Sequence, residues 1–591
     1  MKRLLHSIRR VLGGTHPPGG DLAAGVAAFE RGDHARALAI LRPLATAGEP
    51  EAQHHLGMMY ERGAGVILSA GDAVEWYRRA AEQGFAPAQA ALGDIYLTGR
   101  SVAAVSPTMM AGYQGSRESD QASTVSTLSL LFPNGLAVDP DYQAAARWNR
   151  AAAEQGVAEA QARIGYLHAA GLGVEQDFTA AFEWYRHAAE QGNAPGQVGL
   201  GMLLAGGHGR AIDEAAAAVL FEAAANAGNG SAAYCLGLLH ARGQQTPRDF
   251  AAAAHWFKQG ADRGNVGALF HLAILYLRGA GVARDPFKAE TLLRQAALKH
   301  DTGAMMALGE FHALGQDGSV NPDEAVSWYR EAAQHGHAGA QKTLGRMYAA
   351  GNGVPKDAIE AARWLGKAAE QGDAEAQIIL GAMHAEGRGQ EQDPAAALAW
   401  FVKAAEQGAP GALYNLGIAY LSGLGLPADT GRAIELFRAA ADAGSAEAAF
   451  RLGALHAGGD PVASAQWFER AAELGNADAM FNLGVCYRRG IGVDGNEARA
   501  LELYRQAADA GSIAAQLCLG DAYDEGVGVA PDRYQAIAWY RRAADGGNAN
   551  AQFNLWRLAA VDDDPDEPMK WLAAAALQGH PAAVEALAAR S

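Results

Sequence analysis

The sequence has few cysteines and no excess of positive charge. Cys235, Cys486 and Cys518 are its three cysteines in 591 residues, and no C-x-x-C pair occurs. An odd count without paired spacing argues against a disulfide framework or a structural zinc site, and it is typical of a reducing compartment. The chain carries 48 basic and 65 acidic residues, a formal charge of −17. It therefore lacks the basic field that holds a nucleic-acid backbone, and we expect no nucleic acid as its main partner.

Long apolar runs are also missing. None reaches the ~18 residues that a membrane span needs, although half of the residues are apolar. The first residues, MKRLLHSIRRVLGG, have scattered charges and no uninterrupted apolar core, so they make a poor secretory signal. These absences predict a cytoplasmic protein.

Residues 1–20 form a basic amphipathic segment. Leu4, Leu5 and Ile8 share one helical face with Val11 and Leu12, while the basic residues lie elsewhere. Such a helix can lie on an anionic membrane, which would make the protein membrane-associated through residues 1–14. A frayed helix on the first repeat, or disorder, is the alternative.

Glycine is abundant, and it recurs at a fixed spacing. The string AAEQG ends at Gly84, Gly156, Gly192, Gly372 and Gly408, and every step between Gly156 and Gly444 is 36 residues, with His300 replacing one glycine. Each period predicts two helices. The second helix begins at Asp or Asp-Pro, which suit an N-cap and a first turn. It ends at the recurrent glycine, which adopts a left-handed conformation readily.

Two further slots recur in the same frame. Ten of the eleven tryptophans lie eight residues before the closing slot, where Leu or Ile stands otherwise, so this is a packing position rather than a ligand-stacking one. A glycine recurs inside the first helix, as at Gly345 and Gly417. A glycine inside a helix costs ~1 kcal/mol relative to alanine. We therefore expect the large residue of the second helix, in the tryptophan slot, to approach closely there.

The pattern A-x-x-x-L-G-x-x-Y-x-x-G-x-G-V…D…A-x-x-W-x-x-x-A-A-x-x-G resembles the Sel-one-like repeat family, a branch of the tetratricopeptide-like solenoids. ALGDIYLTG at Ala91 and KTLGRMYAAGNGVPKDAIEAARWLGKAAEQG at Lys342 match it well. The resemblance covers about residues 22–579 and recurs about fifteen times. It implies an all-α fold, a right-handed α/α superhelical solenoid of about fifteen helix pairs, whose concave face holds proteins together in relatives.

The breaks in the period define the expected organisation. We expect a basic amino-terminal segment at 1–20, first repeats at 21–100, a Ser/Thr-rich insertion within a repeat at 101–135, continuous repeats at 136–579 and a capping helix at 580–591. The insertion contains TVSTLSLLF, a β-prone run. A surface loop and a hairpin that docks a partner both remain open for it.

The histidines are the main candidates for a chemical site. His168, His240, His312, His384 and His456 recur every 72 residues in a slot that otherwise holds mostly Tyr. Successive members lie at least ~16 Å apart because each helix contact spans 8–10 Å, so they cannot share a metal ion. His54, His55, His335 and His337 are interpreted as surface residues. Phosphate-loop, H-E-x-x-H and G-x-S-x-G motifs are missing, and we expect no metal, no cofactor and no enzyme activity.

A binding groove is expected on the stacked first helices. The slots two before and one after the first-helix glycine are neighbours on one helical face, and the slot five after extends it. In tetratricopeptide-like relatives the slot two before often carries an Asn that holds a peptide backbone. Polar residues in these slots suit an extended peptide along about 410–560, or they are ordinary solvated residues. The candidates are Arg346, Asn415, Arg451, Asn482, Arg489, Asn554 and Arg557.

These observations favour a non-catalytic scaffold or adaptor. It would bind partner proteins or peptides on its concave face, in the assembly or regulation of a bacterial complex or signalling pathway. One alternative is a hydrolase with an unrecognised, β-lactamase-like site, as described for some cysteine-rich relatives, although the regular cysteine pairs are missing here. The other is a secreted, host-directed effector.

Overall fold

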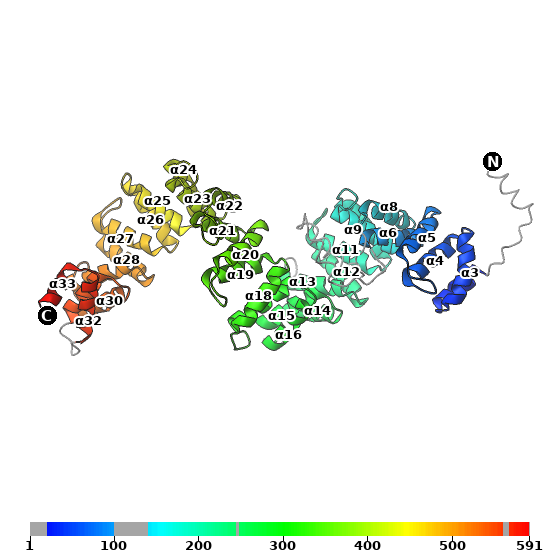
Figure 1. The fold of residues 1–591 in the computed structure, drawn as a ribbon, viewed down its shortest axis with the longest axis horizontal. Helices are drawn as coiled ribbons and strands as arrows, with labels where there is room; N and C mark the ends of the chain where they lie inside the picture. Colours follow the sequence, from blue (N-terminus) through cyan, green and yellow to red (C-terminus); the bar gives the residue numbers. More distant parts are fainter. Residues whose placement is uncertain (1–20, 100–139, 244–246, 560–565, 590–591) are drawn as a thin grey trace, which may run out of the picture. The chain divides into compact units, whose positions relative to one another are not determined.

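A computed structural model describes residues 21–99, 140–243, 247–559 and 566–589, and every regular element in these ranges is an α-helix (Figure 1). The prediction of an all-helical solenoid is therefore confirmed. Segment 1–20 and the insertion 101–135 lie outside the described residues, so the expectations for them stay predictions. The chain divides into two compact units, Met1–Val320 and Asn321–Ser591.

The first unit consists of helix pairs in which a first helix is followed by an antiparallel second helix. The first helices are α2 (Leu22–Glu30), α4 (Pro50–Arg62), α6 (Ala86–Thr98), α9 (Ala158–Ala170), α11 (Ala194–Gly206), α13 (Gly230–Arg242), α15 (Val266–Arg278) and α17 (Thr302–Leu314). The second helices are α3 (His34–Thr46), α5 (Ala70–Glu82), α8 (Tyr142–Ala153), α10 (Phe178–Glu190), α12 (Glu214–Asn226), α14 (Phe250–Asp262) and α16 (Pro286–Ala297).

The second unit continues the same alternation. Its first helices are α19 (Ala338–Ala350), α21 (Ala374–Glu386), α23 (Pro410–Ser422), α25 (Ala446–His456), α27 (Ala477–Arg489), α29 (Ile513–Glu525) and α31 (Ala549–Ala559). Its second helices are α18 (Pro322–Gln334), α20 (Ala358–Glu370), α22 (Pro394–Glu406), α24 (Thr430–Asp442), α26 (Pro461–Glu473), α28 (Glu497–Asp509), α30 (Arg533–Asp545) and α32 (Asp566–Leu577). A last helix, α33 (Pro581–Ala588), packs on α32.

The helix ends follow the repeat frame. Asp177 accepts hydrogen bonds from the backbone N–H groups of Thr179 and Ala180 at 2.9 and 3.0 Å, and so caps α10. This satisfies two of the amides that a helix start leaves without a partner. His300 stands in a closing-glycine slot and adopts a φ of 63°. It is the one non-glycine residue with positive φ in the described part of the chain. The frame, rather than the residue type, imposes that backbone conformation.

The first-helix glycine packs against a ring, but the ring is not the tryptophan. A Cβ atom on Gly381 would lie 2.6 Å from the ring of Phe401, the residue that follows Trp400. Phe and Tyr residues in this following slot, such as Tyr77, Phe257 and Tyr540, are among the largest fully buried side chains, whereas most tryptophans are half-buried. The interpretation of the tryptophan slot as the partner of the glycine is therefore wrong. Trp400 instead lies on the flank of its helix, with Lys403 Nζ 4.3 Å from its ring centre.

Glutamines link consecutive helices in a ladder. Gln377 in α21 donates to the backbone carbonyl of Ala369 in α20 at 3.0 Å and accepts from Gln407, at the end of α22, at 3.0 Å. These two hydrogen bonds satisfy the side-chain amide of Gln377, which would otherwise be buried without a hydrogen bond. The same glutamine pair recurs as Gln53–Gln83, Gln89–Gln155, Gln161–Gln191, Gln341–Gln371 and Gln552–Gln578.

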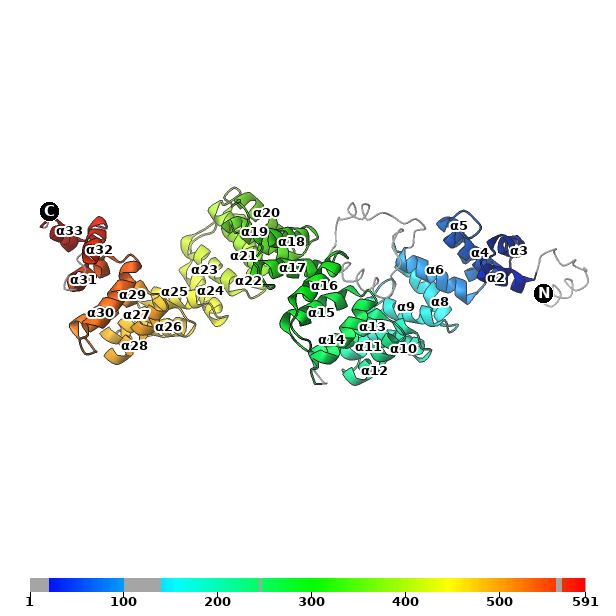
Figure 2. The ribbon, with the colours of Figure 1, turned by 90° about the horizontal axis from the view of Figure 1, so that it is seen from below.

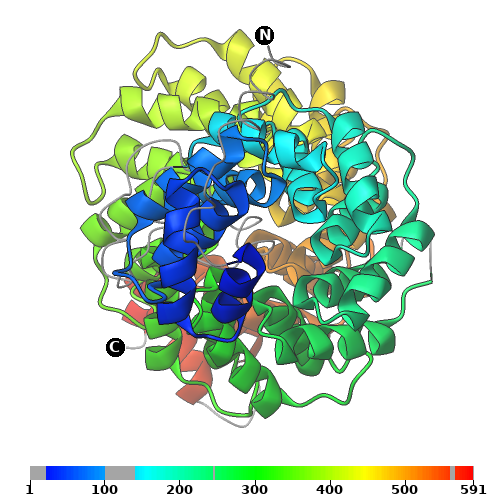
Figure 3. The ribbon, with the colours of Figure 1, turned by 90° about the vertical axis from the view of Figure 1, so that its right-hand side faces the viewer.

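Within each unit the first helices lie closer together than the second helices. In the first unit α9 packs directly on α11, α11 on α13 and α13 on α15 (Figure 2). In the second unit α21 packs on α23 and α29 on α31. Successive second helices make at most marginal contact among the described residues. The row of helices in each unit therefore curves with its first helices on the inside, and Figure 3 shows this curved row for the blue-to-green helices of the first unit.

No helix among the described ranges combines the length and apolar character that crossing a membrane requires.

Candidate binding surfaces on the first helices

The seven predicted binding residues all lie in the second unit. We call the surface formed by the slots two before and one after the first-helix glycine the first-helix face. Asn415 on α23 and Asn482 on α27 occupy the same slot and are half-buried. Neither side chain makes a hydrogen bond to the described residues. Their amides are therefore available donors and acceptors on this face.

Arg451 occupies the same slot on α25, between these two asparagines. It is exposed, and its Nε donates to the hydroxyl of Tyr414 at 3.3 Å. The slot thus carries a polar side chain in three successive repeats. Arg489, at the end of α27, is also exposed.

The other predicted residues are held by carboxylates of the chain itself. Asn554 Nδ2 donates to Asp521 Oδ1 at 3.4 Å, and Arg557 pairs with Asp524. Arg346 Nη1 lies 2.7 Å from Glu375 Oε1. No hydrogen bond or ion pair joins any two of the seven predicted residues, so they line a face rather than form one cluster.

Asp521 is part of a small polar network beneath this face. It accepts a hydrogen bond from the Tyr540 hydroxyl at 2.8 Å as well as the bond from Asn554. Burial raises the pKa of the Asp521 carboxyl, and the hydrogen bond from Tyr540 opposes that rise. The network fixes Asn554 in place, which makes it a less available donor than Asn415 or Asn482.

Sequence reasoning missed a pocket in the first unit. It has a volume of about 300 Å³ and lies between the first helices α4, α6 and α9. Its described lining residues are His54, Glu61, Pro87, Ala90, Ala91, Asp94, Val157, Glu159 and Arg163.

An enclosed ion pair forms one wall of this pocket. Arg163 Nη2 lies 3.2 Å from Asp94 Oδ1, and the two side chains are 14% and 9% exposed. Arg163 also donates to the carbonyl of Ala90 at 3.3 Å. Asp94 and Arg163 occupy the two slots of the first-helix face, so the slot rule itself contained the signal for this pair.

His54 also lines this pocket and is half-buried rather than fully exposed, which corrects the interpretation of it as a surface residue. Its ring centre lies 5.3 Å from that of Tyr77 and 5.5 Å from that of Phe85. Burial, together with the nearby His55 and Arg62, lowers the pKa of His54 to about 4. The ring is therefore neutral at neutral pH.

The interpretation of His337 as a surface residue is also incomplete. His337 accepts a hydrogen bond from the backbone N–H of Ala340 at 3.1 Å and so caps α19.

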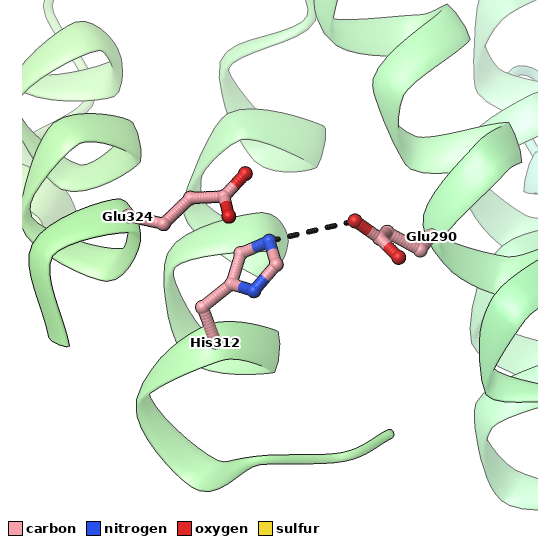
Figure 4. Close-up of side chains that lie close together, drawn as sticks. All are labelled: Glu290, His312 and Glu324. Carbon is pink, nitrogen blue, oxygen red and sulfur yellow. Dashed lines mark ion pairs between the residues drawn. The ribbon is translucent and has the colours of Figure 1, made fainter. Parts of the chain in front are cut away.

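Two of the periodic histidines, His168 and His312, belong to links between repeats. His312 is buried, and its Nε2 lies 3.6 Å from Glu290 Oε1 (Figure 4). Arg294, on the same helix as Glu290, lies within 3.4 Å of the same ring nitrogen. An equivalent arginine reaches this slot as Arg78–Tyr96, Arg150–His168 and Arg505–Tyr523. Tyrosine and histidine thus serve interchangeably as the partner of one arginine, which is the role of a structural contact.

The cysteines are poor nucleophiles. Burial raises the pKa of Cys235 to about 12, and it also raises the pKa of Cys486 and Cys518. Because the thiolate is the reactive form, none of the three is activated.

Comparison with known proteins agrees with the repeat frame. The Sel1 repeat model matches residues 50–85, 86–107, 128–157, 158–193, 194–229, 230–265, 266–301, 302–337, 338–373, 374–408, 410–445, 446–476, 477–512 and 513–548. No curated protein matches the sequence.

Two solved structures show the extent of the likeness. A protective antigen of uropathogenic Escherichia coli with an SLR fold is 30% identical over 74% of this chain and 94% of its own, with a TM-score of 0.52. A Sel1 repeat protein from Oxalobacter formigenes is 32% identical over 51% of this chain and 88% of its own, with a TM-score of 0.44. Because the family model matches most of its length, repeat after repeat, this chain belongs to the Sel1 repeat family.

Proposed function

We propose that this protein is a non-catalytic scaffold that holds partner proteins or extended peptides along the first-helix face. The observation that carries the proposal is the polar row Asn415, Arg451 and Asn482 on three successive first helices. Two of its members are half-buried amides that make no hydrogen bond to the described residues. An asparagine amide offers both a donor and an acceptor, which matches the backbone of an extended peptide.

A cellular role is part of the same proposal. We propose that the protein acts in the cytoplasm, in the assembly or regulation of a bacterial complex or signalling pathway. Membrane contact through residues 1–14 would place this scaffold at a membrane surface.

The test compares affinity capture by the full chain with capture by two double variants. Asn415→Ala with Asn482→Ala should release the captured protein, because each lost hydrogen bond contributes about 1 kcal/mol and two lower the affinity on the order of tenfold or more. Asn226→Ala with Asn352→Ala is the matched control, because both side chains are exposed and lie off this face. Equal capture by all three proteins would refute the placement.

Two other functions are tested separately. A hydrolase would show turnover in an activity screen of the purified protein, and a secreted effector would be found outside the cell by fractionation. Thiols whose pKa is raised offer no support for nucleophilic catalysis by cysteine.

A further inference from the structure

The pocket between α4, α6 and α9 lies where other repeats place an aromatic ring of their own. We propose that it takes one aromatic side chain, a phenylalanine or tyrosine, of a peptide held on the first-helix face. This inference rests on the proposed function, because that peptide supplies the ring. It adds a location in the first unit and an aromatic specificity that the polar row of Asn415, Arg451 and Asn482 does not provide.

The ring slot, three residues before the first-helix glycine or the residue in its place, carries an aromatic residue in six repeats. These residues are Tyr234, Phe270, Tyr414, Phe450, Phe481 and Phe553. A Cβ atom on Gly267 would lie 2.9 Å from the Tyr234 ring, whose centre is 5.7 Å from that of His271. The Tyr414 hydroxyl accepts a hydrogen bond from Arg451 at 3.3 Å. A side chain in the ring slot therefore contacts the first helix of the following repeat.

The α9 side of the pocket is built from the same contact positions. Arg163 stands in the slot that His271 and Arg451 occupy in their repeats, and Glu159 stands in the slot of Gly267. Val157 is the N-cap residue of α9. The corresponding N-cap residue of α6, Phe85, lies 5.5 Å from the ring of His54, the ring-slot residue of α4. Positions that touch a side chain of the chain elsewhere here line a space of about 300 Å³.

Two short side chains leave this space open. The ring slot of α6 holds Ala90, and α8 carries Asn149 where the other second helices carry Tyr, Phe or Leu. Asn149 is buried against Gly93, and its Nδ2 donates to the carbonyl of Ala145 on its own helix at 2.9 Å. Neither the first nor the second helix of this repeat therefore supplies a ring.

The next repeat shows how the chain fills such a space itself. Its ring slot also holds an alanine, Ala162, but α10 carries Tyr185. A Cβ atom on Gly199 of α11 would lie 2.3 Å from the Tyr185 ring, so that ring reaches the following first helix. The combination of alanine and asparagine, rather than alanine alone, distinguishes the repeat of α6 and α8.

The lining provides apolar surface for the two faces of a ring. Pro87, Ala90, Ala91 and Val157 contribute aliphatic groups. The His54 ring is neutral at neutral pH, because its pKa is lowered to about 4. Aromatic rings pack favourably on such groups and on other rings.

The charged lining residues do not require a charged ligand. Glu61 accepts a hydrogen bond from the Tyr77 hydroxyl at 2.6 Å, and Asp94 is ion-paired with Arg163. Glu159 is exposed and remains solvated. A guanidinium also packs well against an aromatic face while its edge keeps a carboxylate partner.

The experiment uses N-acetyl-phenylalaninamide as a probe of the aromatic side chain and N-acetyl-leucinamide as its aliphatic counterpart. Both are titrated into the full chain and followed by ligand-observed NMR. We expect saturable binding of the aromatic amide with a Kd on the order of millimolar, as for a single small anchor. The leucine amide should bind about fivefold more weakly, because it lacks the ring contacts.

One variant and one direct measurement locate the site. Ala90→Phe supplies the missing ring from the chain itself and should weaken binding of the aromatic amide by about fivefold or more. Ile378→Phe, in the ring slot of α21, is the matched control and should leave binding unchanged. In methyl-labelled wild-type protein, the probe ring should show NOEs to the methyl groups of Ala91 and Val157. These NOEs test the site even if Ala90→Phe fails to fold.

The outcomes separate this inference from the proposed function. No saturable binding, equal binding of the leucine amide, NOEs to other methyl groups only, or equal losses in Ala90→Phe and Ile378→Phe would overturn the aromatic site. Partner capture that persists undiminished in Ala90→Phe would overturn its use as a peptide anchor, while leaving the scaffold function standing. Probe binding in a protein that captures no partner would refute the scaffold function, and with it a peptide as the source of the ring.

Discussion

Gly520 of α29 lies against the Tyr540 ring of α30. A Cβ atom on Gly520 would be 2.4 Å from two carbons of that ring. The Tyr540 hydroxyl continues past the glycine to donate to Asp521 at 2.8 Å. This close approach explains why the repeat keeps a helix-weakening residue inside its first helix.

We predict that Gly520→Ala destabilises its repeat although alanine favours helix. Overpacking costs about 1–3 kcal/mol and outweighs the gain of ~1 kcal/mol in helix propensity. Gly366 in α20 is the matched control, because a Cβ atom there meets nothing within 4 Å, and Gly366→Ala should stabilise. Hydrogen exchange of the α29–α30 and α20 amides measures each change locally. Stabilisation by both substitutions would contradict the packing argument.

Gln377→Ala should loosen the contact between α20, α21 and α22. The substitution removes the hydrogen bond that the Ala369 carbonyl accepts from Gln377 and the one that the Gln407 amide donates to it, and each such bond contributes about 1 kcal/mol. Gln392→Ala serves for comparison, since Gln392 makes one exposed hydrogen bond to the Ala385 carbonyl. Hydrogen exchange in α20 and α21 should accelerate only in the first variant. Identical exchange in both would show that the ladder contributes no stability.

Replacing one member of the Asp94–Arg163 pair should lower the free energy of unfolding more than replacing both members with apolar residues. Arg163→Met removes the guanidinium that lies against the Asp94 carboxylate, and the expected loss is about 3 kcal/mol. Adding Asp94→Leu should recover part of this loss, because the carboxylate that was paired with the guanidinium is then removed as well. Urea unfolding of the four proteins of this cycle, read by hydrogen exchange in α6 and α9, provides the coupling energy. Strictly additive effects would mean that the two side chains do not interact.

The amino-terminal repeats should lose stability in mild acid because of His54. Its folded pKa, about 4, lies below its ordinary value of 6.5. Between these values the unfolded chain takes up a proton that the folded chain refuses, so stability falls as the pH drops from 7 to 5 by roughly 1–2 kcal/mol. His54→Leu should flatten this dependence in α4 and α5, whereas His255→Leu, at an exposed position, should not. A wild-type dependence that survives His54→Leu would assign the effect to other groups.

The amino-acid pattern predicts the local structure of each repeat in detail. Helix starts follow from Asp177 and its equivalents, and helix ends follow from the closing glycines. Even where His300 stands in place of the closing glycine, the backbone keeps its left-handed turn. These features depend on backbone hydrogen bonds and φ preferences within a few residues, so a sequence period reveals them directly.

The sequence period did not predict which side chains contact one another between helices. The period identified the tryptophan slot, but the next residue, such as Phe401, faces the glycine. The first-helix slots were correctly grouped on one face, yet nothing in them distinguished the available amides of Asn415 and Asn482 from Asn554, which Asp521 holds.

The sequence by itself therefore determined the all-helical repeat, its length and its helix boundaries, since these follow from local propensities repeated many times. Only the tertiary structure decided which side chains meet across neighbouring first helices. That outcome depends on how each helix is rotated against the next and on which side chain fills the space between them. The pocket at Ala90 shows the difference, because its alanines carry no signal in the sequence and line a pocket only because α4, α6 and α9 pack together.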